Sequence, residues 1–214
     1  MTKNKKILKI IDILSLKYPN PQTPLYHRNM YELLTAIMFS AQMTDKRLNE
    51  ILPVFFRKFK SFEDIHNAKL ESIENFIRSV NYYKTKAKHI KGTAEKIIIN
   101  FNGKIPSDME SLLSLPGIGR KSANIILNEG FKVKNIGVVV DTHVKRLTNR
   151  IFGESFASPI QTEKFLLELV PPQYYKNIAL WLISHGRNTC TAQSPQCEQC
   201  ALAKLCEHWS ANTN

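Results

Sequence analysis

Long apolar runs are missing from this sequence. None approaches the ~20 consecutive apolar residues that a membrane-spanning helix requires. Residues 1–11 also lack an apolar stretch followed by a small-residue cleavage site, so they do not have the pattern of a secretory signal. They are basic, as transit peptides are, but the apolar positions follow a helical period: Ile7, Leu8, Ile11 and Leu14. We therefore expect a first helix of a folded protein in a reducing cytoplasm.

Acidic residues are few for a chain of this size. Asp and Glu together number 18 against 30 Lys and Arg, which leaves a net charge of +12 over 214 residues. An excess of positive charge favours a polyanionic partner, most often nucleic acid. The alternative is that these lysines are simply solvated. With 43% hydrophobic and 22% charged residues, the composition is that of a folded protein and not of a disordered one.

Segments that would form a sheet or a linker are scarce. The only strand-like run is Val-Val-Val at residues 138–140, which is too short and too isolated to found a sheet. No low-complexity segment, Gly/Ser linker or internal repeat marks a domain boundary. Apolar residues recur instead with helical spacing, so we expect an all-α fold of about ten helices. The clearest predicted helices cover residues 30–42, 48–59, 70–80, 84–101, 161–170 and 174–184.

Two glycines surround one apolar residue in the segment 115–124, which reads Leu-Pro-Gly-Ile-Gly-Arg-Lys-Ser-Ala-Asn. We expect a helix before this turn, over residues 108–113 with Ser107 as its N-cap, and a second helix over residues 121–128. The peptide N–H groups of such a turn and of the following helix form an anion site, while Ile118 holds the two helices together. This helix-hairpin-helix pattern binds a DNA phosphate without reading the base sequence. An ordinary turn between helices is the alternative.

Lys121 and Asp141 are the residues best suited to chemistry. Lys121 begins the helix after the hairpin, where the helix dipole disfavours a cation. A nucleophilic lysine needs its pKa brought below ~10.4, and a neutral amine could attack the sugar C1′ of a flipped nucleotide to form a Schiff base. Asp141 precedes a predicted helix, so a capping role explains it. A carboxylate near the lysine could also accept a proton and stabilise positive charge on the sugar.

All four cysteines lie in the last 25 residues of the chain, with gaps of six, two and five residues between them: Cys190, Cys197, Cys200 and Cys206. Clustered cysteines in a cytoplasmic protein favour a metal site over disulfides. Four thiolates suit zinc, and the Cys-x2-Cys piece alone does not distinguish zinc from an iron–sulfur cluster.

Residues 115–131, residues 139–150 and the complete cysteine array resemble the endonuclease III family of the helix-hairpin-helix glycosylase superfamily. The resemblance covers nearly the whole chain. It implies that Lys121 is the Schiff-base nucleophile, that Asp141 is the catalytic carboxylate, and that the four cysteines hold a [4Fe–4S] cluster. Monofunctional relatives lack a lysine at this position, so Lys121 favours an enzyme that both releases a base and nicks the strand.

The same resemblance implies a set of DNA contacts. In the hairpin they are Leu115, Gly117, Ile118, Gly119 and Arg120. The segment Ser-Ala-Gln-Met-Thr-Asp at residues 40–45 is similar to the family segment whose glutamine enters the duplex, so Gln42 is the candidate to fill the space left by an extruded base. A second wedge in the family is a leucine, and Tyr82 stands in its place here, with Lys84 replacing an asparagine. Tyr82 could act as a wedge by stacking.

The resemblance also implies two helical lobes. A helical barrel with the hairpin would span residues 24–135, and a cluster domain would combine residues 1–23 with 136–214, leaving a DNA groove between them. One departure concerns the loop 191–196, Thr-Ala-Gln-Ser-Pro-Gln, which carries no positive charge, although the family's loop is usually basic. This departure argues against a phosphate-neutralising role for the loop.

The function implied is that of a bifunctional glycosylase and AP lyase for oxidised pyrimidines. Its partner would be double-stranded DNA with a damaged base or an abasic site, bound by a monomer in the prokaryotic cytoplasm at the nucleoid. One alternative is a monofunctional mismatch or adenine glycosylase, against which Lys121 argues. Another is a non-catalytic DNA-binding protein with a zinc-stabilised tail. That alternative explains the charge and the hairpin but leaves Lys121 and Asp141 without a use.

Overall fold

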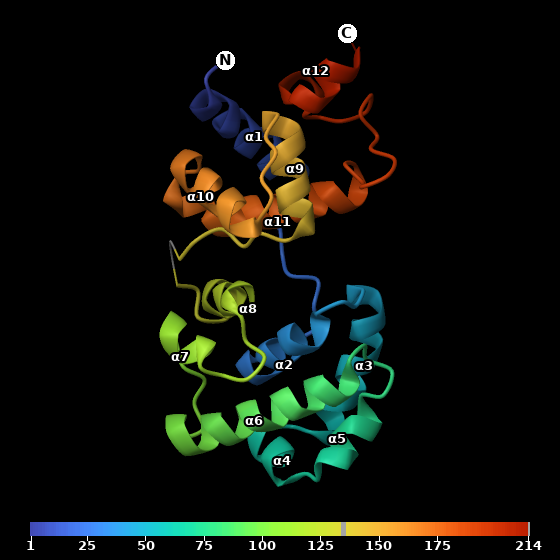
Figure 1. Cartoon of the computed structure of the whole chain (residues 1–214), viewed down its shortest axis with the longest axis vertical. Helices are drawn as coiled ribbons and strands as arrows, with labels where there is room; N and C mark the ends of the chain where they lie inside the picture. Colours follow the sequence, from blue (N-terminus) through green and yellow to red (C-terminus); the bar gives the residue numbers. More distant parts are fainter. Residues whose placement is uncertain (134–135, 214) are drawn as a thin grey trace. The chain divides into compact units, whose positions relative to one another are not determined.

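The computed structural model describes residues 1–133 and 136–213, and within these ranges every regular element is a helix (Figure 1). The expected all-α fold is confirmed. None of the described helices is long and apolar enough to cross a membrane. The α-helices are α1 (Lys3–Lys17), α2 (Met30–Ser40), α3 (Asp45–Lys58), α4 (Phe62–Asn67), α5 (Leu70–Phe76), α6 (Tyr83–Phe101), α7 (Met109–Leu113), α8 (Arg120–Ile125), α9 (Thr142–Phe152), α10 (Pro159–Leu169), α11 (Tyr175–Asn188) and α12 (Glu207–Thr213).

The chain forms two compact units. One is Pro24–Val133, and the other combines Met1–Thr23 with the described part of Lys134–Asn214. The domain boundary expected between residues 135 and 136 touches the segment 134–135, which lies outside the described residues.

The unit with both termini is built around α9 and α11 and packs α1 against α10 and α11. The apolar stripe of α1 is buried there, with Ile10 and Leu14 fully inaccessible to solvent. The indole N–H of Trp181 donates to the carbonyl of Tyr18 over 2.9 Å, which ties α11 to the end of α1. The α9–α11 crossing is close at Gly186, because a Cβ there would meet the His143 ring at 2.9 Å. The N-terminal segment is therefore an integral part of this unit.

Helix α6 organises the other unit through three lysines spaced five residues apart. Each step of five residues turns about 140° around a helix, so the three side chains point toward three different neighbours. Each ammonium group donates to carbonyls at the C-terminal end of another helix, where intrahelical partners are missing and the dipole favours a cation. The bonds run from Lys86 to Phe39 and Ala41 of α2, from Lys91 to His66 and Ala68 of α4, and from Lys96 to Ser114 of α7.

The two helices of the hairpin differ in detail from the sequence prediction. Ser107 is not the N-cap of α7; Asp108 is, and its carboxylate accepts from the Ser111 N–H at 2.8 Å. That bond lowers the pKa of Asp108, since it favours the charged carboxylate. The second helix is α-helical only over Arg120–Ile125 and continues as a π-helical turn, Ile126–Gly130. Gly130 lies directly against the Met30 side chain of α2, whose end would have to move to make room for a Cβ.

Candidate active site and iron–sulfur site

The hairpin turn depends on Gly117 for two separate reasons. Its φ of +77° lies in the left-handed region that side chains other than glycine rarely adopt. A Cβ on Gly117 would also lie 2.7 Å from Nδ1 of His89, in the middle of α6. The main chain of the turn therefore lies directly against α6.

The same face of α6 supports the turn at two further points. The hydroxyl of Thr93 donates to the Pro116 carbonyl at 2.9 Å, and the Lys96 ammonium donates to the Ser114 carbonyl at 2.8 Å. With His89, these residues recur at intervals of three to four, which places them along one helix face. The two hydrogen bonds come from side chains that precede their partners by 23 and 18 residues, a support that the motif itself does not reveal.

Helix α8 begins without a side-chain cap. Its N-cap is Gly119, which forms no capping bond and has open space where a Cβ would be. Arg120 and Lys121 follow, both exposed, and the first turn contains no acidic residue. The first N–H groups of a helix have no intrahelical acceptor. This helix start therefore combines amide donors with two cationic side chains, which suits an anion such as a DNA phosphate.

Leu115 and Ile118 occupy a different position from the glycines beside them. Their side chains are buried, at 2% and 5% exposure, and the Ile118 N–H donates to the Leu115 carbonyl at 3.2 Å. Ile118 holds the hairpin from inside, as its sequence pattern predicts. Any direct contact of these two residues with DNA would have to use other main-chain atoms.

Gln42 and Tyr82 share an unusual backbone conformation. Both have φ of +58° and both side chains are exposed, Tyr82 at 64%. A non-glycine residue in this region costs of order 1–3 kcal/mol and persists only where the surroundings hold it. Here the Asn81 side chain donates to the Gln42 carbonyl, which links the two turns directly. The structure therefore brings the two predicted wedge residues together within one unit.

Asp141 is the N-cap of α9, as its sequence position predicts. One carboxylate oxygen, Oδ1, accepts from the Val144 N–H at 2.9 Å, and the side chain remains partly exposed. His143 lies close by, and burial is the largest influence lowering its pKa, partly opposed by the charge of Asp141. Asp141 belongs to the unit with both termini, and Lys121 belongs to the unit Pro24–Val133.

The four cysteines line one small apolar cavity of about 20 Å³. Burial raises the pKa of the Cys200 and Cys206 thiols, and the neighbouring cysteines raise it further. Such thiols become thiolates at neutral pH when a metal compensates the charge. Among the residues the structure describes, no three His, Cys, Asp or Glu side chains converge closely enough for a single metal ion.

Two side chains from α9 and α11 contact the cysteine sulfurs. Nε2 of His185 lies 3.3 Å from Cys200 Sγ, and Arg150 donates to Cys190 Sγ at 3.3 Å. Burial lowers the pKa of His185 to about 4, so the ring is neutral and can donate one N–H to sulfur. Arg150 also donates to the carbonyls of Thr191 and Ala192, which places a guanidinium against the uncharged loop 191–196.

Comparison with known proteins agrees with this geometry. Residues 35–172 match the model of the HhH-GPD superfamily of base excision DNA repair proteins, and residues 190–206 match the iron–sulfur binding domain of endonuclease III. Endonuclease III from Synechocystis is 38% identical over 96% of this chain and 93% of its own length. That from Buchnera aphidicola subsp. Acyrthosiphon pisum is 40% identical, covering 95% and 96%.

The chain belongs to the endonuclease III family.

Solved structures extend the comparison. A trapped endonuclease III–DNA covalent intermediate, an estranged-adenine complex, matches with a TM-score of 0.92 at 34% identity and full coverage of both chains. A thermostable thymine-DNA glycosylase matches at 24% identity with a TM-score of 0.85, over 97% of this chain and 98% of its own, and shows the shared fold.

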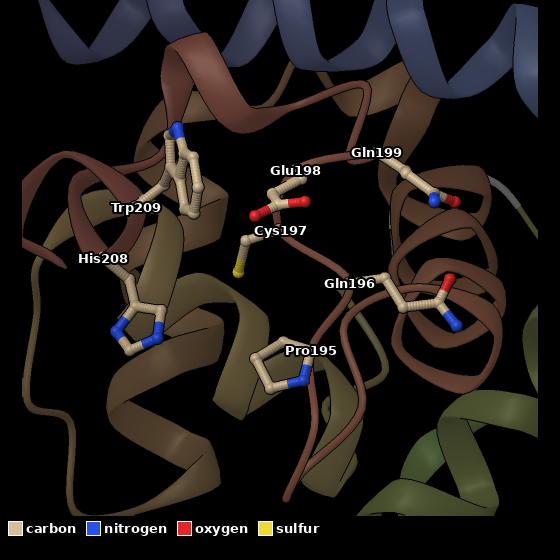
Figure 2. A pocket seen from close by; sticks show the side chains of 7 residues that line it. All are labelled: Pro195, Gln196, Cys197, Glu198, Gln199, His208 and Trp209. Carbon is tan, nitrogen blue, oxygen red and sulfur yellow. The ribbon is translucent and has the colours of Figure 1, made fainter. Parts of the chain in front are cut away.

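As a member of the endonuclease III family, the protein carries a [4Fe–4S] cluster. The residues fit this group because all four thiol side chains line one cavity, and nitrogens of Arg150 and His185 lie 3.3 Å from two of the sulfurs, where hydrogen bonds would tune a cluster. A wider pocket of about 470 Å³ shares Cys197, His208 and Pro195 with this cavity, and Figure 2 shows the sulfur of Cys197 pointing toward the space between the other two side chains. Cys197 therefore lines both the cysteine cavity and this wider pocket.

The cluster leads to a direct chemical prediction. Purified protein is expected to be brown and to contain roughly four iron atoms and four sulfides per chain. Replacing Cys200, whose sulfur also contacts His185, should abolish the visible absorbance and most of the iron in a Cys200→Ala variant. Iron and sulfide analysis with zinc measured in parallel checks this expectation. One zinc ion per chain without iron or sulfide would contradict it.

Several supporting residues have no distinctive signal in the sequence. Lys86, Lys91 and Lys96 are ordinary basic residues in a basic helix, and their spacing of five is the only signal that they point to different neighbours. Similarly, His185 precedes the cysteine array without any mark of its role. These contacts join positions far apart in the sequence, and local periodicity does not identify the partner that each side chain contacts.

Proposed function

We propose that this protein is a bifunctional DNA glycosylase and AP lyase that removes oxidised pyrimidines from double-stranded DNA in base excision repair. The family supports this activity, and a relative of similar fold has been captured in a covalent intermediate with DNA. The observation that carries the proposal is the position of Lys121. Its amine is exposed in the first turn of an uncapped helix, directly after a hairpin suited to a phosphate.

In the proposed reaction, Lys121 acts as nucleophile. Its amine forms a bond to the sugar C1′ while the bond from C1′ to the base breaks, and the base leaves with a proton. The sugar ring then opens to give an imine between Nζ and C1′. Loss of a proton from C2′ expels the 3′-phosphate by β-elimination, and water releases the enzyme from the unsaturated sugar.

Asp141 is proposed to assist the first half of this reaction. Its carboxylate accepts the proton that Lys121 loses on attack and stabilises positive charge that develops on the sugar. One of its oxygens is already oriented by the Val144 N–H, which holds the carboxylate at the start of α9. Gly117, Gly119 and Arg120 are proposed to bind a phosphate through the hairpin and the α8 N-terminus, with Leu115 and Ile118 supporting them.

We further propose the division of labour between the units. Residues 24–135 would form the helical barrel domain with the hairpin, and residues 1–23 with 136–214 the cluster domain, in which Cys190, Cys197, Cys200 and Cys206 bind the iron atoms. The protein would act as a monomer in the cytoplasm of a prokaryotic cell, associated with the nucleoid. The chemistry requires only the amine and the carboxylate, so the cluster is assigned no step in it.

A single incubation tests the proposed activity. The wild-type protein is mixed with a duplex that holds one abasic site, and the cleaved strand is analysed by electrophoresis and mass spectrometry. We expect a nick with an unsaturated sugar at the 3′ end, which is the product of β-elimination. A protein that binds this duplex without cleaving it would be a DNA-binding protein or a monofunctional glycosylase, and the lyase proposal would fail.

If Gln42 fills the space left by an extruded base, Gln42→Ala should slow the reaction on duplex DNA more than on single-stranded DNA. Processing of a damaged base in duplex DNA should slow by about tenfold or more, because the space left by the extruded base is no longer filled. Cleavage of a single-stranded abasic oligonucleotide should change much less, since no stack has to be maintained there. Single-turnover rates on both substrates measure the effect. Equal losses on both would assign Gln42 a structural role.

A further inference from the structure

At the end of α2 and in the loop that carries Gln42, the four consecutive main-chain carbonyls of residues 39–42 all accept hydrogen bonds. The carbonyls of Phe39 and Ala41 accept from the Lys86 ammonium, each at 2.7 Å, that of Ser40 from the Met43 N–H at 3.1 Å, and that of Gln42 from the Asn81 amide. Three of these four bonds come from the segment 81–86. The same segment contains Tyr82, the second proposed wedge.

Lys86 is poorly explained as a surface cation. Its side chain is buried, with 7% of the residue exposed, and burial lowers its pKa to about 8. Both of its hydrogen bonds end on main-chain carbonyls at a helix C-terminus. Burying a lysine is costly, and hydrogen bonds to its ammonium group are what offset that cost. The geometric result of these bonds is that the Gln42 turn cannot shift without α6 and the Tyr82 turn.

We propose that Lys86 and Asn81 are positioning residues for base extrusion, which lock the Gln42 and Tyr82 turns into one rigid unit. This inference rests on the proposed function of the two side chains as wedges. Both have φ of +58°, a conformation that needs support from outside the turn. Because the backbone of both turns is fixed before DNA binds, less conformational freedom is lost when the two side chains enter the stack, and their main chains arrive at a fixed separation.

Helix α6 also fixes where this unit stands relative to the hairpin. Tyr82 is the N-cap of α6, and His89, Thr93 and Lys96 of the same helix contact or bond the hairpin turn. A helix is rigid over this length, so it sets the distance between the wedge side chains and the phosphate site. Lys86 therefore lies on α6 between the Tyr82 turn and the residues that support the hairpin. Its hydrogen bonds join α2 to this helix.

The test compares Lys86→Met with Lys91→Met. Methionine keeps an unbranched apolar stem of similar length but cannot donate. Lys91 makes the same kind of bond, but both of its bonds end on carbonyls at the end of α4 and not on a wedge turn. Asn81→Ala supplies a second variant at an exposed position, which remains informative if Lys86→Met does not fold. Folding is checked by thermal melting and by the visible absorbance of the cluster.

Extrusion is followed with 2-aminopurine placed beside an abasic-site analogue in duplex DNA, because its fluorescence rises on unstacking. We expect Lys86→Met and Asn81→Ala to reduce the fluorescence change and to slow duplex cleavage by about tenfold, with single-stranded abasic cleavage within about twofold of wild type. Lys91→Met should leave the duplex-to-single-strand ratio unchanged. When Lys86→Met or Asn81→Ala is combined with Gln42→Ala, the rate of duplex cleavage should fall little further than in Gln42→Ala alone, because both substitutions act through the same turn.

The outcomes separate this inference from the function on which it rests. If Gln42→Ala slows duplex cleavage selectively but Lys86→Met and Asn81→Ala do not, the wedge stands and the positioning role is wrong. If Gln42→Ala has no selective effect, the wedge itself is wrong and the positioning role falls with it. Fully additive losses in the double variant, or an equal change of the ratio in Lys91→Met, would also overturn the inference.

Discussion

Lys121→Gln should abolish trapping of the protein on DNA. Borohydride reduces an imine to a stable amine, so wild-type protein mixed with abasic DNA and borohydride should give a permanent cross-link. Without the primary amine no imine forms at this position, and we expect trapping and strand cleavage to fall by roughly 10³-fold or more. Gel electrophoresis under denaturing conditions measures both.

DNA binding should largely survive in this variant, because the hairpin and the α8 start offer main-chain N–H groups that the substitution leaves in place. The matched control is Lys164→Gln, which removes one charge from an exposed position of α10. It should trap and cleave like the wild type. Full trapping by Lys121→Gln would show that another amine is the nucleophile, and the mechanism proposed above would be wrong.

Replacement of Asp141 should strongly reduce base release. Two variants separate its proposed catalytic role from its role as the N-cap of α9. Asparagine caps a helix as well as aspartate does, whereas alanine costs about 0.5–2 kcal/mol of stability at this position. Both lack the negative charge. We therefore expect Asp141→Asn and Asp141→Ala to lose base release alike, by about 10²–10⁴-fold, while only Asp141→Ala melts at a lower temperature.

Release of the damaged base and cleavage at a ready-made abasic site should be measured separately for these variants. Cleavage at the abasic site should suffer less, since the base is already gone and less positive charge has to be stabilised there. If Asp141→Asn keeps wild-type base release and only Asp141→Ala loses it, the residue is a helix cap and not a catalytic group.

Two errors in the local sequence prediction have physical causes. Ser107 and Asp108 are adjacent, and either type caps helices well, so the pattern alone does not choose between them. The carboxylate forms the bond to Ser111, and α7 starts one residue later than a Ser107 cap requires. The π-helical turn at Ile126–Gly130 lies in a segment whose apolar period looks α-helical, and Gly130 there meets Met30 from another helix.

The sequence by itself determined the all-α class, the hairpin turn and the cysteine array, while the catalytic roles of Lys121 and Asp141 stay predictions. Each of these depends on residue type and short spacing, such as the helical period of apolar residues or the two glycines around Ile118. Such features act between residues that are close along the chain, so they can be read without knowing the packing.

The tertiary structure alone decided how these parts are held. Lys86 reaches back 47 residues to Phe39, and Asn81 reaches 39 residues to Gln42. Likewise, His185 contacts Cys200, and Arg150 contacts Cys190 from 40 residues away. A hydrogen bond of this kind depends on where two chain segments meet after folding, and every lysine, asparagine or arginine on a helix surface offers the same donors beforehand. The partner that each one finds is set by the packing of the helices.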